Sequence, residues 1–278
     1  PEERTEAMDP GELVTSLSRN FEDSDWHPET DRATSGGAFW RSSGKRGLPQ
    51  VMEVVPAPQP FFPGQDRALR LRTRWREDGS PGQDDLVTVR HKRIAPEAPL
   101  LRADRPTLVA RVHVPPLEDL KAPYSVLGIR IQAASSDLAA YPIKPDVYYP
   151  SIWVYQVPGE AHSYLKLRVG DGYAQDVRGP DLEQGPGWYT LAIAFDGDGV
   201  GHYYCAKGLE LPPEQDAIRT TDDFPGGTGA RMDRIDYHFL SLGAPPGGAL
   251  SADFLIGDLS WYRRPLDENG GNDAGAEE

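Results

Sequence analysis

The chain has 278 residues, a formal net charge of −14 and a hydrophobic fraction of 38%, with 29 glycines and 27 prolines. Residues 1–17 and 267–278 carry most of the negative charge, and this acidity argues against general affinity for duplex nucleic acid. The single cysteine, Cys205, excludes an internal disulfide framework, and no apolar run approaches the roughly 18 residues that cross a bilayer. We therefore expect no nucleic-acid or membrane partner, and the oligomeric state stays open.

The first seventeen residues are predicted to form an extension with a short helix near residues 9–14. Asp9 suits the N-cap of that helix, and Pro10 suits its first position. At the other end, residues 267–278 contain no apolar residue larger than alanine and are predicted to be a disordered acidic tail. One domain over residues 18–266 lies between them.

Strand patterns recur through this domain, bounded by clusters of glycine, proline and aspartate. Only single helical turns are expected, near residues 115–120 and 212–215. Many strands without intervening long helices exclude a parallel βαβ arrangement and favour a two-sheet antiparallel sandwich over a closed barrel. We predict an all-β jelly-roll sandwich with little helix. Its clearest strands are residues 68–75, 107–114, 125–132, 151–156, 164–169, 188–195, 201–206, 236–242 and 253–263.

Several of these strands alternate apolar and basic side chains, so that each strand has one apolar and one basic face. If the strands share a sheet, the basic faces join into a surface suited to carboxylates and sulfates. In the alternative, the arginines pair with acidic side chains on neighbouring strands. The candidate ligand-binding residues on these faces are Arg70, Arg72, Arg74, Arg130, Lys166 and Arg168.

Aromatic residues cluster in the strand at residues 151–156. Trp153 and Tyr155 lie on the face opposite Ile152 and Val154. Indole and phenol rings pack against the apolar face of a sugar, so both residues are candidate carbohydrate contacts. In the alternative, both rings belong to the core between the sheets.

Oxygen-rich segments near residues 20–26 and 253–258 are candidates for a structural calcium site, with Glu22 and Asp258 as ligands. The first and last strands of a sandwich often lie side by side, which would bring the two segments together. The run Asp196-Gly197-Asp198-Gly199 lacks the remaining ligands of an EF-hand loop and predicts a plain hairpin turn. No organic cofactor is expected.

Three segments carry a resemblance to a known group. Phe21-Glu22-Asp23 with Trp26 resembles the first strand of concanavalin A-like and carbohydrate-binding jelly-roll modules. Residues 187–197 resemble a central strand of such domains, and residues 254–262 resemble their final strand, except that Gly257 stands where an aspartate is usual. The resemblance spans residues 18–266 and implies the fold more strongly than a function.

Some jelly-roll polysaccharide lyases use Arg, Gln, His and Tyr on one sheet, and residues 164–175 resemble one of their strands. The resemblance implies that Arg72 and Gln132 would neutralise a uronate carboxylate, with His113 or Tyr173 as base or acid. A retaining glycosidase would need two carboxylates about 5 Å apart. Glu160 and Glu183 both fall in predicted loops, which disfavours hydrolysis.

Three functions therefore stay open, and catalysis is not decided. A carbohydrate-binding domain for an extracellular polysaccharide is favoured, and an anionic polymer would suit its basic face. A polysaccharide lyase or glycoside hydrolase on the same scaffold is the second, and a structural or protein-interaction module is the third. Such an architecture implies a secreted, periplasmic or cell-surface location.

Overall fold

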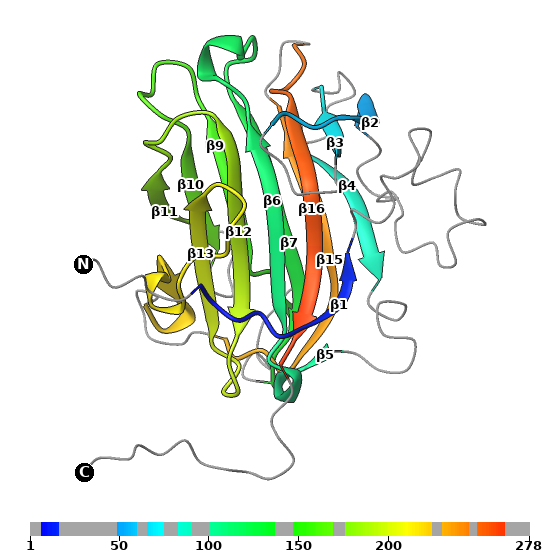
Figure 1. The fold of residues 1–278 in the computed structure, drawn as a ribbon, viewed down its shortest axis with the longest axis vertical. Helices are drawn as coiled ribbons and strands as arrows, with labels where there is room; N and C mark the ends of the chain where they lie inside the picture. Colours follow the sequence, from blue (N-terminus) through cyan, green and yellow to red (C-terminus); the bar gives the residue numbers. More distant parts are fainter. Residues whose placement is uncertain are drawn as a thin grey trace, which may run out of the picture.

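Two antiparallel β-sheets pack face to face and enclose the apolar core (Figure 1). The computed structural model describes residues 7–16, 49–59, 66–74, 83–90, 100–136, 147–168, 176–223, 230–244 and 249–264. Of these, residues 15, 83–90, 236 and 237 are described by their backbone alone. The all-β two-sheet sandwich predicted from the sequence is confirmed.

The first sheet, called the β6 sheet below, has the strand order β14-β13-β12-β6-β16-β3-β2. Strand β3 pairs with the beginning of β16, and β1 pairs with its end. The strands of this sheet are β1 (Glu12–Ser16), β2 (Val51–Pro56), β3 (Arg67–Arg72), β6 (Thr107–Val114), β12 (Gly187–Phe195), β13 (Gly201–Lys207), β14 (Arg219–Thr220) and β16 (Phe254–Arg263).

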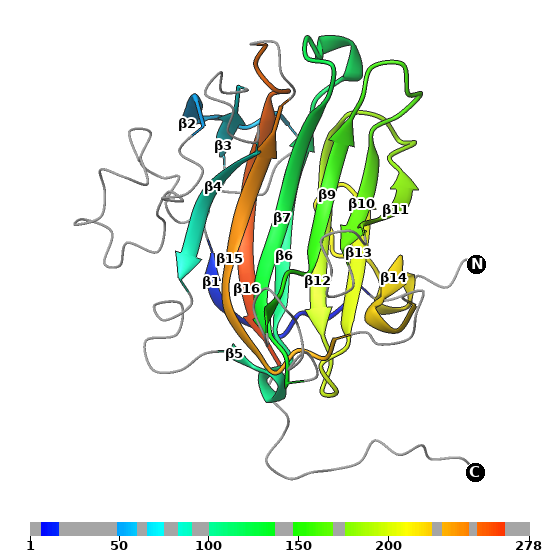
Figure 2. The ribbon, with the colours of Figure 1, turned by 180° about the vertical axis from the view of Figure 1, so that it is seen from behind.

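The second sheet, called the β7 sheet, has the order β11-β10-β9-β7-β15-β4 and is seen from its own side in Figure 2. Short strands β5 and β8 pair with β15 and β7. Its strands are β4 (Gln83–Arg90), β5 (Leu100–Leu101), β7 (Ser125–Ala134), β8 (Val147–Tyr148), β9 (Ser151–Gln156), β10 (Tyr164–Arg168), β11 (Asp176–Asp181) and β15 (Arg234–Gly243).

The core lies between the sheets because the strands alternate in polarity. Leu127, Ile152 and Leu165 point inward from three neighbouring strands of the β7 sheet and are fully buried. Phe254 and Trp261 of β16 meet them from the β6 sheet. Each such side chain contributes about 1.5–3 kcal/mol on burial, so the inward faces fix which side of each strand is left outside.

In the part of the chain that the structure describes, the helical content is confined to single turns. The 3-10 helices at Leu117–Asp119 and Glu214–Asp216 confirm the two turns predicted from the sequence. Two further turns span Arg102–Asp104 and Thr221–Asp223. No helix among the described residues is long and apolar enough to cross a membrane.

The short helix predicted near residues 9–14 is wrong. The Asp9 carboxylate accepts a hydrogen bond from the Gly11 backbone N–H at 2.9 Å, two residues away, and Gly11 has a φ of 89°. A left-handed glycine breaks the helical path, and residues from Glu12 onward pair with the end of β16 instead. A methyl group at Gly11 would lie 2.3 Å from the carbonyl oxygen of Arg263, so this approach requires glycine.

A single basic surface would require that the strands with basic faces share one sheet, and they do not. Strands β3 and β6 belong to the β6 sheet, whereas β7 and β10 belong to the β7 sheet. Since both sheets turn their apolar faces inward, the two sets of basic residues lie on opposite outer faces of the sandwich. The two sets of basic residues therefore cannot contact the same sugar unit of a ligand.

Candidate functional site

The outer face of the β7 sheet gathers aromatic and basic side chains from five strands and the short segment after β8. Its cross-strand register sets them in rows, because residues paired across antiparallel strands point to the same side. One row runs Phe239–Arg130–Ser151–Arg168–Asp176, and the next runs Ser241–Gly128–Trp153–Lys166–Arg178. We call this surface the aromatic–basic face; its rings and cations are Tyr149, Trp153, Tyr155, Tyr164, Phe239, Arg130, Lys166, Arg168 and Arg178.

Trp153 lies at the centre of this face and is only 6% exposed. Its benzo edge covers Gly128 of the neighbouring strand, where a methyl group would lie 2.5 Å from both Cε3 and Cζ3. The absence of a side chain at Gly128 therefore allows the indole to lie against the sheet. The sequence alternative that placed Trp153 in the core between the sheets is wrong, because Ile152 and Val154 occupy that side.

Arg130 is buried among aromatic rings. Its guanidinium carbon lies 4.2 Å from the centre of the Phe239 ring, 5.2 Å from that of Trp153 and 5.5 Å from that of Tyr149. Nη1 also donates to the Ser241 hydroxyl at 3.2 Å. Such cation–π contacts are worth about 0.5–2 kcal/mol each, so Arg130 orders the rings around it while adding positive charge.

Arg168 borders the same tryptophan from strand β10. Its guanidinium carbon lies 5.7 Å from the Trp153 ring, and two of its nitrogens contact the Asp176 carboxylate at 2.7 and 3.0 Å. Two parallel bonds between a guanidinium and a carboxylate fix its geometry. The sequence alternative, in which arginines of this kind pair with a neighbouring strand, holds for Arg168.

Tyr155 and Tyr164 form the third row of the face. Their rings stack with centres 5.4 Å apart and planes at 12°. Lys166 lies 4.5 Å from the Tyr155 ring centre, and Arg178 lies 3.9 Å from that of Tyr164. Burial, followed by the charge of Asp176, raises the pKa of Tyr155 to about 12, so its hydroxyl stays protonated at neutral pH. Tyr155 and Lys166 are half-buried and keep contact with solvent.

Gln132 and Tyr149 form a polar contact beside Arg130. The Tyr149 hydroxyl donates to Oε1 of Gln132 at 3.2 Å, and the Tyr149 ring meets Phe239 edge-on. Gln132 is two residues from Arg130 on β7 and therefore lies on the same outer face. Amide, phenol and guanidinium groups are thus brought together here.

Of the remaining predicted ligand-binding residues, Arg70 and Arg72 belong to β3 of the other sheet, and Arg74 follows that strand in an isolated bridge with Leu250. Arg70 on the outer face of the β6 sheet forms ion pairs with Glu53 at 2.8 Å and Asp253 at 3.2 Å. Arg72 donates through Nε to the Ser251 carbonyl at 3.3 Å. Arg70 and Arg72 therefore lie on the outer face opposite that of Trp153 and Tyr155.

The four residues implied by the lyase resemblance do not form one site. Arg72 and His113 lie on the outer face of the β6 sheet and Gln132 on that of the β7 sheet, with the core between them. Tyr173 lies outside the described residues. His113 packs edge-on against Trp188 at 5.3 Å, and burial, followed by the charge of Lys207, lowers its pKa below 6.5.

Asp258 does not fit the role of a calcium ligand. Arg111 Nη1 lies 3.1 Å from its Oδ2, Ser260 donates to the same oxygen at 2.6 Å, and Ser16 donates to Oδ1 at 2.7 Å. A guanidinium at that distance would repel a divalent cation. Glu22 lies outside the described residues, so calcium binding by that residue stays a prediction.

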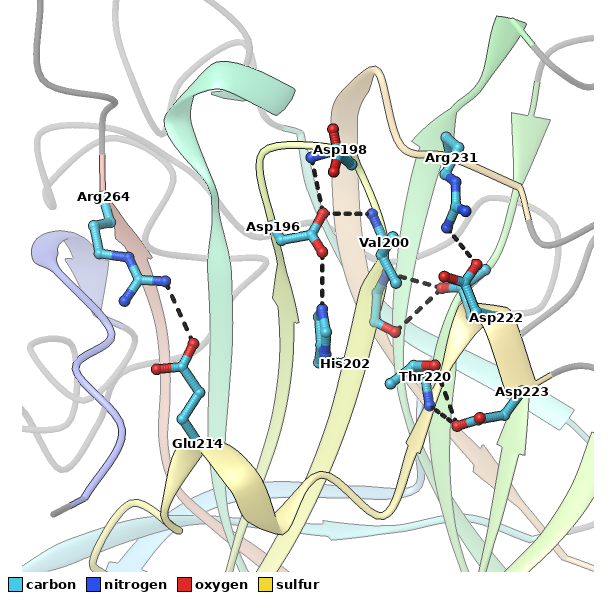
Figure 3. Close-up of polar contacts among 12 residues, drawn as sticks. Asp196, Asp198, Val200, His202, Glu214, Thr220, Asp222, Asp223, Arg231 and Arg264 are labelled. Carbon is cyan, nitrogen blue, oxygen red and sulfur yellow. Dashed lines mark hydrogen bonds and ion pairs between the residues drawn. The ribbon is translucent and has the colours of Figure 1, made fainter. Parts of the chain in front are cut away.

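The acidic end of the β12–β13 hairpin uses its carboxylates to hold the turn (Figure 3). Oδ1 of Asp196 accepts from the backbone N–H groups of Asp198 and Val200, each at 2.9 Å, and Oδ2 lies 3.1 Å from Nε2 of His202. This confirms the plain hairpin turn predicted from the sequence. The neighbouring carboxylates are paired too: Asp222 with Arg231, Asp223 with Thr220 and Glu214 with Arg264.

The sequence did not indicate several residues that build the aromatic–basic face. Gly128 reads as a simple interruption of an apolar strand, yet it accommodates the indole of Trp153. Arg178 and Phe239 come from strands whose position beside β10 and β7 depends on long-range pairing. Tyr164 is different, because its alternation with Leu165 already places it on the same face of the strand as Lys166.

The sheets and their pairing define the type of architecture. It is an all-β jelly-roll sandwich of two antiparallel sheets. No protein family matches the chain, and no curated protein matches its sequence. The likeness to known proteins described below therefore comes from comparing structures and not sequences.

Three solved structures illustrate the likeness. A carbohydrate esterase from the Shiga toxin-encoding bacteriophage phi24B aligns with a TM-score of 0.49 and 11% identity, over 91% of this chain and 99% of its own. An alginate lyase from Pseudomonas aeruginosa gives 0.42 and 7%, over 71% and 83%. The CBM2 module of the evolved Dit protein of Lactobacillus casei BL23 phage J-1 gives 0.40 and 13%, over 92% and 97%. At these values the likeness carries no argument about activity.

Proposed function

We propose that this chain binds carbohydrate through the aromatic–basic face, with a polysaccharide outside the cell as its partner. The observation that carries the proposal is the half-buried ring of Tyr155, with the Lys166 ammonium 4.5 Å from its centre, beside Trp153 and Tyr164 on one outer face. Aromatic rings pack against the C–H face of a sugar, and a neighbouring cation binds its hydroxyl or acidic groups. These are the two kinds of contact that sugar recognition needs.

The test is affinity electrophoresis through gels that contain polyuronate, sulfated or neutral polysaccharide. We expect Tyr155→Ala and Lys166→Gln each to weaken binding about tenfold, which corresponds to about 1.4 kcal/mol. Arg70→Gln is the matched control, since it removes a basic side chain from the outer face of the β6 sheet. Wild-type mobility unchanged on every polymer would contradict the proposal, as would equal losses in all three variants.

A second candidate is elimination from a uronate polymer, favoured by the contact between Tyr149 and Gln132 beside Arg130. An amide and a guanidinium can neutralise a uronate carboxylate. Tyr149, as the phenolate, would take the C5 proton and return it to the departing glycosidic oxygen, while the C4–O bond breaks and a C4=C5 double bond forms. The unsaturated product would absorb in the ultraviolet. We expect Tyr149→Phe to abolish any such signal while leaving gel retardation intact; a flat wild-type trace on all polyuronates would exclude this candidate.

A further inference from the structure

The indole N–H of Trp153 has no hydrogen-bond acceptor, although the side chain is 94% buried. The two other tryptophans that the structure describes are satisfied. Nε1 of Trp188 donates to the Pro58 carbonyl at 2.9 Å, and that of Trp261 donates to Nδ1 of His238. Leaving a buried donor unpaired costs free energy, so the one described tryptophan whose N–H has no acceptor calls for an explanation.

The neighbours of the ring define the surroundings of this donor. The benzo edge of Trp153 covers Gly128 of β7, so Nε1 belongs to the edge that does not sit on that glycine. Strand β10 flanks β9 on the side opposite β7 and carries Lys166 directly across from Trp153. The donor therefore belongs to the part of the aromatic–basic face that is bordered by Arg130, Lys166 and Arg168.

The charges around the ring favour an anionic acceptor. Two guanidinium groups, Arg130 and Arg168, lie within 5.7 Å of the indole centre, and Lys166 is its cross-strand neighbour. Asp176, the carboxylate in the same row, binds Arg168 through two bonds and offsets its charge, so Arg130 and Lys166 supply the net positive charge here. Coulomb attraction at these distances is substantial in a partly desolvated site, so an oxyanion is favoured over a neutral oxygen.

We infer that, once the side chains that cover it in the free protein move aside, Nε1–H of Trp153 donates to an oxyanion substituent of the bound sugar, either a carboxylate or a sulfate ester. The inference rests on the proposed function and deepens it by naming the class of ligand. Tyr155 would supply the stacking surface for the sugar ring, while Trp153 would donate a hydrogen bond to its anionic group. The position would thus select acidic polysaccharides over neutral ones.

The direct test follows the tryptophan indole N–H signals of the wild-type protein by NMR during titration with oligosaccharides. Uronate, sulfated and neutral oligomers of similar length serve as separate probes, so that the two anionic sources are distinguished. We expect one indole signal, absent from the Trp153→Phe spectrum, to move downfield with at least one anionic oligomer and to stay in place with the neutral one. An unmoved Trp153 signal at saturation with every anionic oligomer overturns the inference.

The second measurement compares affinities for the same oligomers. Trp153→Phe should weaken anionic binding by roughly ten- to a hundredfold, the effect of losing one hydrogen bond to a charged group. Trp188→Phe, the matched substitution on the other outer face, should stay within about twofold of wild type. If Tyr155→Ala weakens binding but Trp153→Phe does not, the inference fails and the proposed function stands. If wild type binds no oligomer, both fail.

Discussion

At the scale of single residues, two tryptophans offer a matched test of what an indole hydrogen bond contributes to stability. Trp153 and Trp188 are 6% and 4% exposed, and both lie on outer faces of the sandwich. Only the Nε1–H of Trp188 has an acceptor, the Pro58 carbonyl. Changing each to phenylalanine removes the same atoms, so the loss of ring volume largely cancels in the comparison.

We expect Trp188→Phe to lower the free energy of unfolding by about 1–2 kcal/mol more than Trp153→Phe does. The reason is that the first change leaves a carbonyl without its donor, whereas the second removes a donor that has no partner. Urea denaturation followed by circular dichroism measures both values. Equal losses, or a larger loss for Trp153→Phe, would show that the indole N–H of Trp153 is satisfied in solution without a ligand.

At the scale of strands, the contact between β7 and β9 depends on one missing side chain. Gly128→Ala would place a methyl group 2.5 Å from two ring carbons of Trp153. We expect this overpacking to cost about 1–3 kcal/mol and to weaken carbohydrate binding, because the indole must move off the sheet. Gly197→Ala in the β12–β13 turn is the control, since a methyl group there meets no atom within 4 Å.

Urea denaturation and gel retardation together check this prediction. A Gly128→Ala protein that keeps both wild-type stability and wild-type binding would mean that the indole adjusts freely. In that case the close approach of Trp153 to β7 would have no role in holding the aromatic–basic face. Loss of stability in Gly197→Ala by the same amount would point to a general effect of replacing glycine.

The position of each strand along the chain can be predicted from the local sequence pattern, whereas the sheet to which the strand belongs cannot. The predicted bounds of β6 and β9 match the structure because apolar alternation marks which residues face the core. Pairing β3 with β16, about 180 residues later in the chain, is set by tertiary contacts that no local window contains. The mistaken helix near Asp9 shows the same limit, since pairing of Glu12 with Arg263 overrides a good N-cap.

At the scale of the whole molecule, this limit explains which candidate site residues lie together on one outer face. Trp153, Tyr155, Arg130, Lys166 and Arg168 come from three strands that lie side by side in the β7 sheet, so their outward faces coincide. Arg70 alternates in the same way but lies on the opposite side of the sandwich. Periodicity predicts that a residue points outward, and only the topology determines which of the two outer faces it joins.

The stability of the sandwich should depend on pH through His113. Burial lowers the pKa of His113 from 6.5, with a further decrease from Lys207 that Asp253 partly opposes. In the unfolded chain the imidazole recovers an ordinary pKa near 6.5, so below that pH the unfolded state binds more protons than the folded state. The free energy of unfolding therefore falls as the pH drops below about 6.5, until the folded state also takes up the proton.

His113→Gln isolates this contribution. One histidine changes the free energy of unfolding by at most about 1.4 kcal/mol per pH unit, so the variant should lose part of the wild-type dependence between pH 7.5 and 5.5. Urea titrations at several pH values measure the slopes, and His202→Gln is the control on the same outer face. If His113→Gln keeps the full wild-type slope, other groups set the acid sensitivity, and the packing of His113 against Trp188 does not hold the imidazole neutral.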